Sequence, residues 1–172
     1  PGAPNAGAFN GYATTPVFDI PSGNKPGPVN VGLSSPDAGV TIRYTYNGID
    51  PNGGAAAYAA PLAIGATTVV HAQAYSSDPM VLPSFIETNT YLIAENHTMA
   101  VVSLSGPDVI TLLNGTQLEP VGHLEFFGAD GQLKDEARGD CNKHGNDSWA
   151  YAQRGIDYVV RDQMGYNDEI HH

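Results

Sequence analysis

Residues 40–51 read VTIRYTYNGIDP, and this stretch decides the fold class of the first half of the chain. Ile42, Tyr44 and Tyr46 alternate with polar residues, which is the period of a half-buried β-strand. The segment that follows, residues 47–54, is rich in Asn, Gly, Asp and Pro, which are the residues that form tight turns. The stretch therefore predicts a strand that ends in a turn.

Similar strands are predicted on both sides of this stretch. Val29, Val31 and Leu33 share one face of a preceding strand. A following strand at residues 67–75 places Val70, Ala72 and Ala74 on one face and Val69, His71 and Gln73 on the other, and residues 85–93 form the last strand of this group. Short strands separated by Gly and Pro indicate an antiparallel β-sandwich.

Composition supports a mainly β protein and excludes several functions. The 172 residues include 20 Gly and 13 Pro, an excess that favours short strands and turns over long helices. A net charge of −11 argues against nucleic acid as a partner, because nucleic-acid binding needs a basic surface. No stretch of about 18 apolar residues is present, so membrane insertion is not expected.

The first half of the chain resembles the C-terminal domain of chitobiase and β-hexosaminidase. The resemblance is carried by VTIRYTYNGIDP at 40–51, Tyr58, PLAI at 61–64 and TTVVHAQA at 67–74, with Asn47 where the family usually has Asp. It implies an immunoglobulin-like sandwich that is an accessory part of extracellular bacterial proteins. A fold of this kind does not by itself imply catalysis.

The second half has its own predicted elements. Residues 99–104 form an apolar run of strand length, and residues 108–115 predict a short helix capped by Asp108 and ended by Gly115. A strand at 121–127 leads into an Asp-Gly hairpin turn at 129–132. Two more strands are predicted near 136–143 and 155–161.

This half resembles the start of spore coat protein H (CotH)-like domains, which are similar to atypical protein kinases. The matching segments are TYLI at 90–93, VVSL at 101–104, residues 120–131, and HGNDSW at 144–149. Residues 1–5 resemble the end of a lamin-tail domain. We therefore expect a linker at 1–15, a chitobiase-type sandwich at 16–93 and the incomplete N-terminal part of a CotH-like domain at 94–172, cut from a longer chain.

The kinase resemblance predicts no complete catalytic site in this chain. The family's basic pair corresponds here to Gln153 and Arg154, which leaves Arg154 as a candidate phosphate-contacting residue. The acidic metal ligands of a kinase belong to a later lobe. We therefore expect no catalytic residues, and kinase activity only if such a lobe follows.

Several residues are candidates for ligand binding. His123 and Glu125 share one face of a strand and could meet a metal ion, although a solvent-facing polar stripe is the preferred interpretation. Asp50 with Asn47 and Asn52 could bind Ca²⁺, but one carboxylate is few for such a loop, so a structural turn is preferred. No cofactor beyond this Ca²⁺ candidate is predicted.

Aromatic and polar side chains near the end of the chain form a second group of candidates. Trp149, Tyr151 and Tyr166 could stack on a sugar, and packing between strand and loop is the preferred alternative. The remaining polar candidates, none with an assigned role, are His144, Asp147, Asp157 and Asp162.

Together these patterns predict a non-catalytic structural, adhesive or spacer part of a large secreted or cell-surface bacterial protein. The alternatives are the N-terminal lobe of a CotH-like kinase and a carbohydrate-binding accessory module. The predicted partners are neighbouring domains of a longer chain, with polysaccharide or self-association through strand edges as further candidates.

Overall fold

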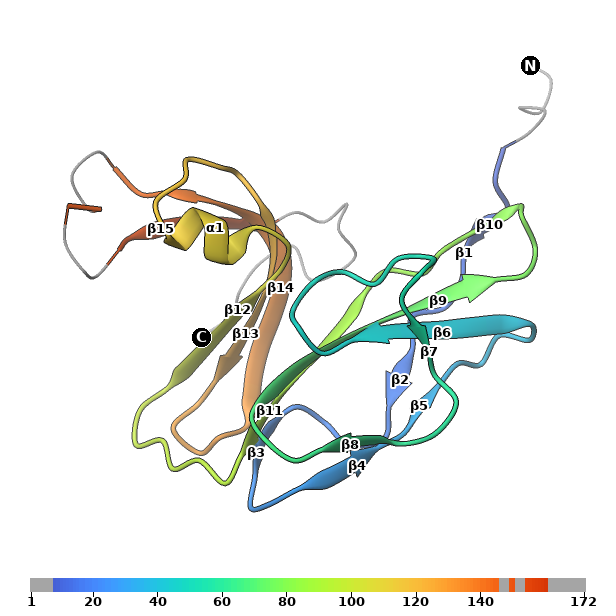
Figure 1. Ribbon diagram of the computed structural model, residues 1–172, viewed down its shortest axis with the longest axis horizontal. Helices are drawn as coiled ribbons and strands as arrows, with labels where there is room; N and C mark the ends of the chain where they lie inside the picture. The colour runs from blue at the N-terminus through green and yellow to red at the C-terminus, as the bar shows by residue number, and fades with distance from the viewer. Residues whose placement is uncertain (1–7, 146–148, 151–153, 161–172) are drawn as a thin grey trace.

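The computed structural model describes residues 8–145, 149–150 and 154–160. Within these ranges the chain forms fifteen strands and one five-residue helix, α1 Val109–Leu113. The prediction of a mainly β protein is confirmed. Figure 1 shows two groups of strands side by side, one coloured blue to green and the other yellow to orange.

The first group is built on a five-stranded sheet in the order β3-β11-β9-β6-β7. Neighbouring strands are antiparallel except for β3, which runs parallel to β11. The predicted strands at 40–46, 67–75 and 85–93 are confirmed as β6, β9 and β11. The bounds are β3 Gly23–Lys25, β6 Val40–Thr45, β7 Ala56–Ala57, β9 Thr68–Ser76 and β11 Glu87–Ile93.

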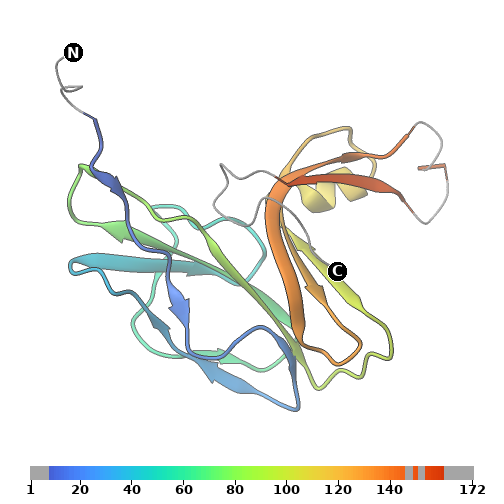
Figure 2. The ribbon, with the colours of Figure 1, turned by 180° about the vertical axis from the view of Figure 1, so that it is seen from behind.

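Three two-stranded ladders accompany this sheet. They pair β1 Gly11–Tyr12 with β10 Val81–Leu82, β2 Val17–Phe18 with β5 Leu33–Ser34, and β4 Val29–Val31 with β8 Leu62–Ile64. The single strand predicted through Val29, Val31 and Leu33 is therefore wrong. It is divided at Gly32, whose N–H donates to Asp19 Oδ1 at 2.7 Å, and its two parts pair with different strands. Figure 2 brings the blue β1 and β2 to the viewer's side.

The core of the first group lies between the five-stranded sheet and the β2–β5 and β4–β8 ladders. Tyr91 is fully buried there, and its hydroxyl donates to the carbonyl of Ile20 at 2.8 Å. Burial of these apolar side chains supplies the main driving force for this part of the fold. The core residues are Val31, Leu33, Ile42, Leu62, Ile64, Val70, Ala72, Tyr91 and Ile93.

The second group is an antiparallel four-stranded sheet in the order β12-β13-β14-β15. Its strands, all of them predicted, are β12 Val101–Ser105, β13 Val121–Phe127, β14 Leu133–Lys143 and β15 Ile156–Val160. The predicted helix is present as α1, but capping by Asp108 is wrong. Asp108 has a φ of 62° and makes no side-chain cap hydrogen bond.

Strand β11 joins the two groups because both of its faces are buried. Tyr91 and Ile93 point into the core of the first group. The Thr88 and Thr90 side chains point the other way, and their hydroxyls hydrogen-bond to His123 and Glu125 of β13. The side chains that join the two groups are thus polar, unlike those of the core.

Candidate functional site

Three side chains from distant parts of the sequence meet where the two strand groups join. Asp50 lies in the loop after β6, His71 in β9 and His123 in β13. Asp50 Oδ1 is 3.3 Å from His71 Nδ1 and 3.2 Å from His123 Nε2. The two imidazole rings have centroids 4.5 Å apart. The histidines are 0% and 2% exposed, and the Asp50 side chain is 23% exposed.

The local sequence explains how Asp50 reaches this position. Gly48 has a φ of 68°, a left-handed conformation that glycine adopts without strain. A Cβ at Gly48 would lie 3.3 Å from Ser105 Cβ, so the turn approaches β12 closely. Asn47 Oδ1 accepts a hydrogen bond from the Ile49 N–H at 3.2 Å and stabilises the turn. The turn predicted from Asn-Gly-Ile-Asp-Pro therefore places the carboxylate of Asp50 against the second sheet.

Each member of this cluster has a further partner that orients it. His71 Nε2 lies 2.9 Å from Ser105 Oγ, and His123 Nδ1 lies 2.9 Å from Thr88 Oγ1. Arg138 of β14 donates from Nη2 to Asp50 Oδ2 at 2.7 Å. The outer nitrogens of the two imidazoles, His71 Nε2 and His123 Nδ1, contact these hydroxyls. The inner nitrogens, His71 Nδ1 and His123 Nε2, point at the same carboxylate oxygen.

The environment fixes the charges of two members. Burial alone would raise the pKa of Asp50, but the ring nitrogens of His123 and His71 and the guanidinium of Arg138 hold that pKa well below its usual range. Burial lowers the pKa of His123 to about 4, although Asp50 opposes this change. At neutral pH Asp50 is therefore ionised and His123 is neutral. A neutral imidazole is the form that can donate a lone pair to a metal ion.

A second group of ionisable side chains lies nearby and has a different character. Glu125 accepts hydrogen bonds from the backbone N–H of Thr90 at 3.1 Å and from the Thr90 hydroxyl. Burial raises the pKa of Glu125 to about 7. Burial together with the charges of Glu136 and Glu125 raises the pKa of Glu87 to about 8. These carboxyls therefore retain protons at a pH where Asp50 is fully ionised.

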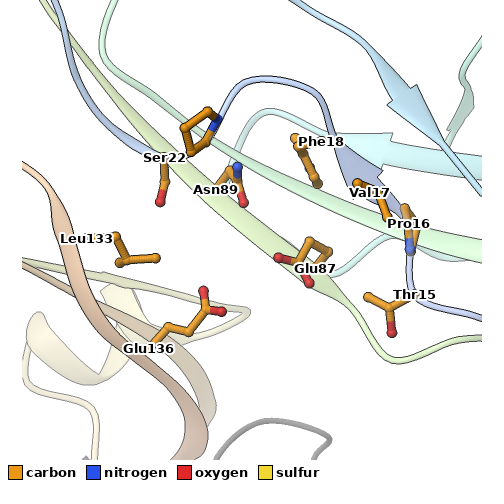
Figure 3. Close-up of a pocket in the computed structure, with 10 residues that line it drawn as sticks. Thr15, Pro16, Val17, Phe18, Ser22, Glu87, Asn89, Leu133 and Glu136 are labelled. Carbon is orange, nitrogen blue, oxygen red and sulfur yellow. The ribbon is translucent and has the colours of Figure 1, made fainter. Parts of the chain in front are cut away.

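Glu87 and Glu136 face a pocket of about 390 Å³ between the two strand groups. Figure 3 shows the two carboxyls extending toward one another from β11 and β14. The pocket combines apolar and polar walls and is open to water, and Glu87 is not paired with a basic side chain by any ion pair within the described part of the chain. Its lining residues are Thr15, Pro16, Val17, Phe18, Pro21, Ser22, Glu87, Asn89, Leu133 and Glu136.

The structure changes the interpretation of the candidates predicted on strands and turns. His123 and Glu125 do share one face, but the predicted solvent-facing stripe is wrong, since they are 2% and 1% exposed. Asp50 does not combine with Asn47 and Asn52. The amide oxygens of these residues accept the N–H groups of Ile49 and Gly54, and the carboxylate of Asp50 turns toward the second sheet.

The candidates near the end of the chain lie far from this cluster in sequence and make their own contacts. Trp149 Nε1 donates to the Gly155 carbonyl at 2.6 Å, and the cations of Lys143 and Arg154 lie 5.7 and 5.5 Å from its ring centroid. Arg154 also donates to the Leu113 carbonyl. The other described pair, His144 and Asp157, is exposed, with Nδ1 and Oδ1 2.6 Å apart. Tyr151, Tyr166, Asp147 and Asp162 lie outside the described residues.

Sequence reasoning missed His71, Arg138, Glu87 and Glu136 as site residues. One signal for His71 was available: its neighbours in the strand are the apolar Val70 and Ala72, so His71 lies on the face opposite the predicted core. Arg138 and Glu136 alternate with Ala137 and Gly139 in the same way. Such alternation identifies a face, but it does not show whether water or another sheet covers that face.

The fold and cluster define a mainly β accessory-type module joined to a second antiparallel sheet through a polar junction. Residues 20–82 match the family model described as "Chitobiase/beta-hexosaminidase C-terminal domain". This match confirms the resemblance predicted for the first half, and it identifies an accessory domain of a type that is usually non-catalytic. No curated protein and no solved structure matches the chain. Among the described residues, no helix is long and apolar enough to cross a membrane.

Proposed function

We propose that the chain is a structural spacer within a secreted or cell-surface protein, in which the chitobiase-type module is held in a fixed orientation to the sheet that follows it. The observation that carries this proposal is the buried polar junction. Asp50 bonds to Arg138, His71 to Ser105, and Thr90 to Glu125, so each pair links the first strand group to the second. Directional bonds between buried groups favour one relative orientation over others.

The family match supports the non-catalytic part of this proposal. It covers Asp50 and His71 and ends before β11, β13 and Arg138, so the junction combines residues from the matched segment with residues outside it. Within the proposal, the matched segment is an immunoglobulin-like sandwich, and residues 94–172 begin a CotH-like domain. The proposed partners are then neighbouring domains of a longer chain, and polysaccharide or self-association are further candidates.

Nuclear magnetic relaxation of backbone amides tests the spacer role. A fixed junction predicts one rotational correlation time for amides of β6 and β9 and for amides of β13 and β14. Two distinct correlation times would contradict the proposal, because they would show that the two groups move independently. Arg138→Met is the informative variant, because it removes the hydrogen bond to Asp50 and keeps a long, unbranched side chain at this position.

The kinase alternative is tested separately by incubation with ATP and Mg²⁺ or Mn²⁺. We expect no phosphate transfer by this chain, because an acidic metal-binding motif from a later lobe is required in that family. Transfer that is lost in Arg154→Ala would favour the kinase alternative.

The carbohydrate-binding alternative rests on Trp149. The neighbouring cations of Lys143 and Arg154 and the bond to Gly155 support a packing role for this ring instead. Binding to chitin or cellulose that disappears in Trp149→Ala would contradict the packing role.

A further inference from the structure

We infer that Asp50, His71 and His123 form a binding site for a divalent metal ion of the zinc class, between the two strand groups. The ligand atoms of these residues all lie within 4.8 Å of one another. They are two imidazole nitrogens and one carboxylate oxygen. Such a mixed set suits Zn²⁺ and its first-row neighbours, whereas Ca²⁺ requires six to eight oxygen ligands.

The hydrogen bonds of the two histidines are compatible with lone pairs at the centre of the cluster. A neutral imidazole has one N–H and one lone pair. The outer nitrogens of His71 and His123 each lie 2.9 Å from a hydroxyl oxygen, which can accept an N–H bond. Without an ion, His123 Nε2 can donate to Asp50 Oδ1 at 3.2 Å. Metal binding requires the other tautomer, in which the protons lie on the outer nitrogens and both inner nitrogens present lone pairs to the centre. A cation between these three atoms would relieve their mutual repulsion.

His71 supplies the independent observation that points to a ligand. Its side chain is 0% exposed, yet Nδ1 makes no hydrogen bond. Asp50 Oδ1 is 3.3 Å away but outside hydrogen-bonding geometry. Buried polar atoms without a partner are rare in folded proteins, because each costs about 1–3 kcal/mol. An ion at the centre of the cluster would give Nδ1 its partner.

The distances fit metal coordination. In a tetrahedral zinc site with bonds of about 2.0–2.1 Å, neighbouring ligand atoms are about 3.3 Å apart. The two nitrogen-to-oxygen distances, 3.3 and 3.2 Å, agree with that spacing. The imidazole nitrogens need only approach each other to complete three corners of the tetrahedron. The partly exposed Asp50 gives an ion access and leaves the fourth corner for water.

The partners of the three ligands resemble the outer shell of known metal sites. Ligating histidines usually donate their other N–H group, and ligating carboxylates usually accept further hydrogen bonds. Ser105, Thr88 and Arg138 fill these roles here. Arg138 binds Oδ2 and therefore leaves Oδ1 to face both imidazoles.

The ion would link the two strand groups directly. Asp50 and His71 belong to the segment matched by the family, and His123 belongs to the second sheet. The role of the ion as a clamp rests on the proposed spacer function, but ion binding itself does not. A ligand that binds only the folded state also stabilises it.

The test measures Zn²⁺ binding to the full chain with His171→Ala and His172→Ala, because terminal histidines bind metals on their own. Calorimetry and competition with a chromophoric chelator give the stoichiometry and Kd. We expect one equivalent of bound ion and a higher Tm with Zn²⁺. His71→Asn and His123→Gln should each weaken binding more than about 100-fold, and Thr88→Val about 10-fold, since loss of outer-shell partners costs 10–100-fold.

His97→Ala and His144→Ala are matched controls, because His97 is half-buried, His144 is exposed, and each is paired with an acidic residue outside the cluster. Both controls should keep the affinity of the parent chain. Co²⁺ supplies a second readout, since its visible absorption reports nitrogen coordination and should disappear in His71→Asn. Circular dichroism of each variant shows that lost binding does not reflect unfolding.

Three results would overturn the inference: no binding once His171 and His172 are replaced, unchanged affinity in both His71→Asn and His123→Gln, or loss of binding in His97→Ala or His144→Ala. The relaxation experiment separates this inference from the spacer function. A single correlation time in a chain that binds no Zn²⁺ would reject the metal site and leave the spacer function intact. Two correlation times with tight Zn²⁺ binding would reject the spacer function alone.

Discussion

Replacement of Glu87 by Gln should stabilise the protein at alkaline pH. Burial and the charges of Glu136 and Glu125 raise the pKa of Glu87 from 4.5 to about 8. In the unfolded chain this carboxyl loses its proton near pH 4.5, whereas in the folded chain it keeps the proton up to about pH 8. The folded state is therefore progressively disfavoured as the pH rises between these values, and Gln mimics the protonated acid.

The range from pH 6.5 to 8 isolates this effect. Below pH 6.5, His123 acts in the opposite direction, because its pKa is lowered to about 4 and the unfolded chain then takes up the proton. Above pH 6.5 the carboxyl groups with raised pKa values determine how stability changes with pH. One such group changes the free energy of unfolding by 1.36 kcal/mol per pH unit, which sets a limit of about 2 kcal/mol over this range. Because water in the adjoining pocket screens the charge of Glu87, the expected loss of stability is about 1 kcal/mol.

Urea unfolding at pH 6.5 and pH 8, in EDTA to exclude metal, measures this loss. The wild type should be less stable at pH 8, and Glu87→Gln should remove part of the difference. The remaining difference in stability between the two pH values comes from Glu125, whose pKa is about 7. Glu119→Gln, at an exposed position, is the control and should leave the pH dependence unchanged. Equal stability of the wild type at both pH values, or an unchanged difference in Glu87→Gln, would refute the reasoning.

Three further experiments test the junction and the second sheet by chemical denaturation. Gly48→Ala should lower the free energy of unfolding by about 1–2 kcal/mol, because φ is 68° and the new Cβ would lie 3.3 Å from a neighbouring side chain. Gly53→Ala is the control, because a Cβ at Gly53 would meet open space. Equal effects of the two substitutions would contradict this reasoning. Asp50→Asn and Arg138→Met, alone and combined, should show a coupling of about 1–2 kcal/mol, and additivity within about 0.5 kcal/mol would argue against a direct bond. Phe127→Ala, at a fully buried position, should cost about 3–5 kcal/mol, and a loss below about 1 kcal/mol would show that the side chain is not packed.

Local patterns in the sequence predict the strands well, because period-two alternation and turn residues are local properties. They identify β6, β9 and β13 and place the turn that contains Asp50. They fail at Gly32, where two short strands with different partners lie on one alternating pattern. They also fail at Asp108, since a good capping residue by type adopts a left-handed conformation instead.

The junction could not be predicted from the sequence for a different reason. Polar residues on alternate positions of a strand usually face water, so His123 and Glu125 suggest a solvated face. Here the polar faces of two sheets cover one another, and Thr88 of β11 lies against His123 of β13. Which faces meet depends on contacts between residues more than 30 positions apart, such as the 35 that separate Thr88 from His123. No local period carries that information.

Within the junction, carboxyl groups differ in charge because their neighbours differ. Asp50 is ionised because Arg138 and two imidazoles surround it. Glu87 retains its proton because it is largely buried and because its charged neighbours are other carboxyls. An ionised Glu87 beside Glu136 and Glu125 would place uncompensated negative charge in a partly buried region, which is unfavourable. Proton retention by Glu87 avoids that cost at neutral pH.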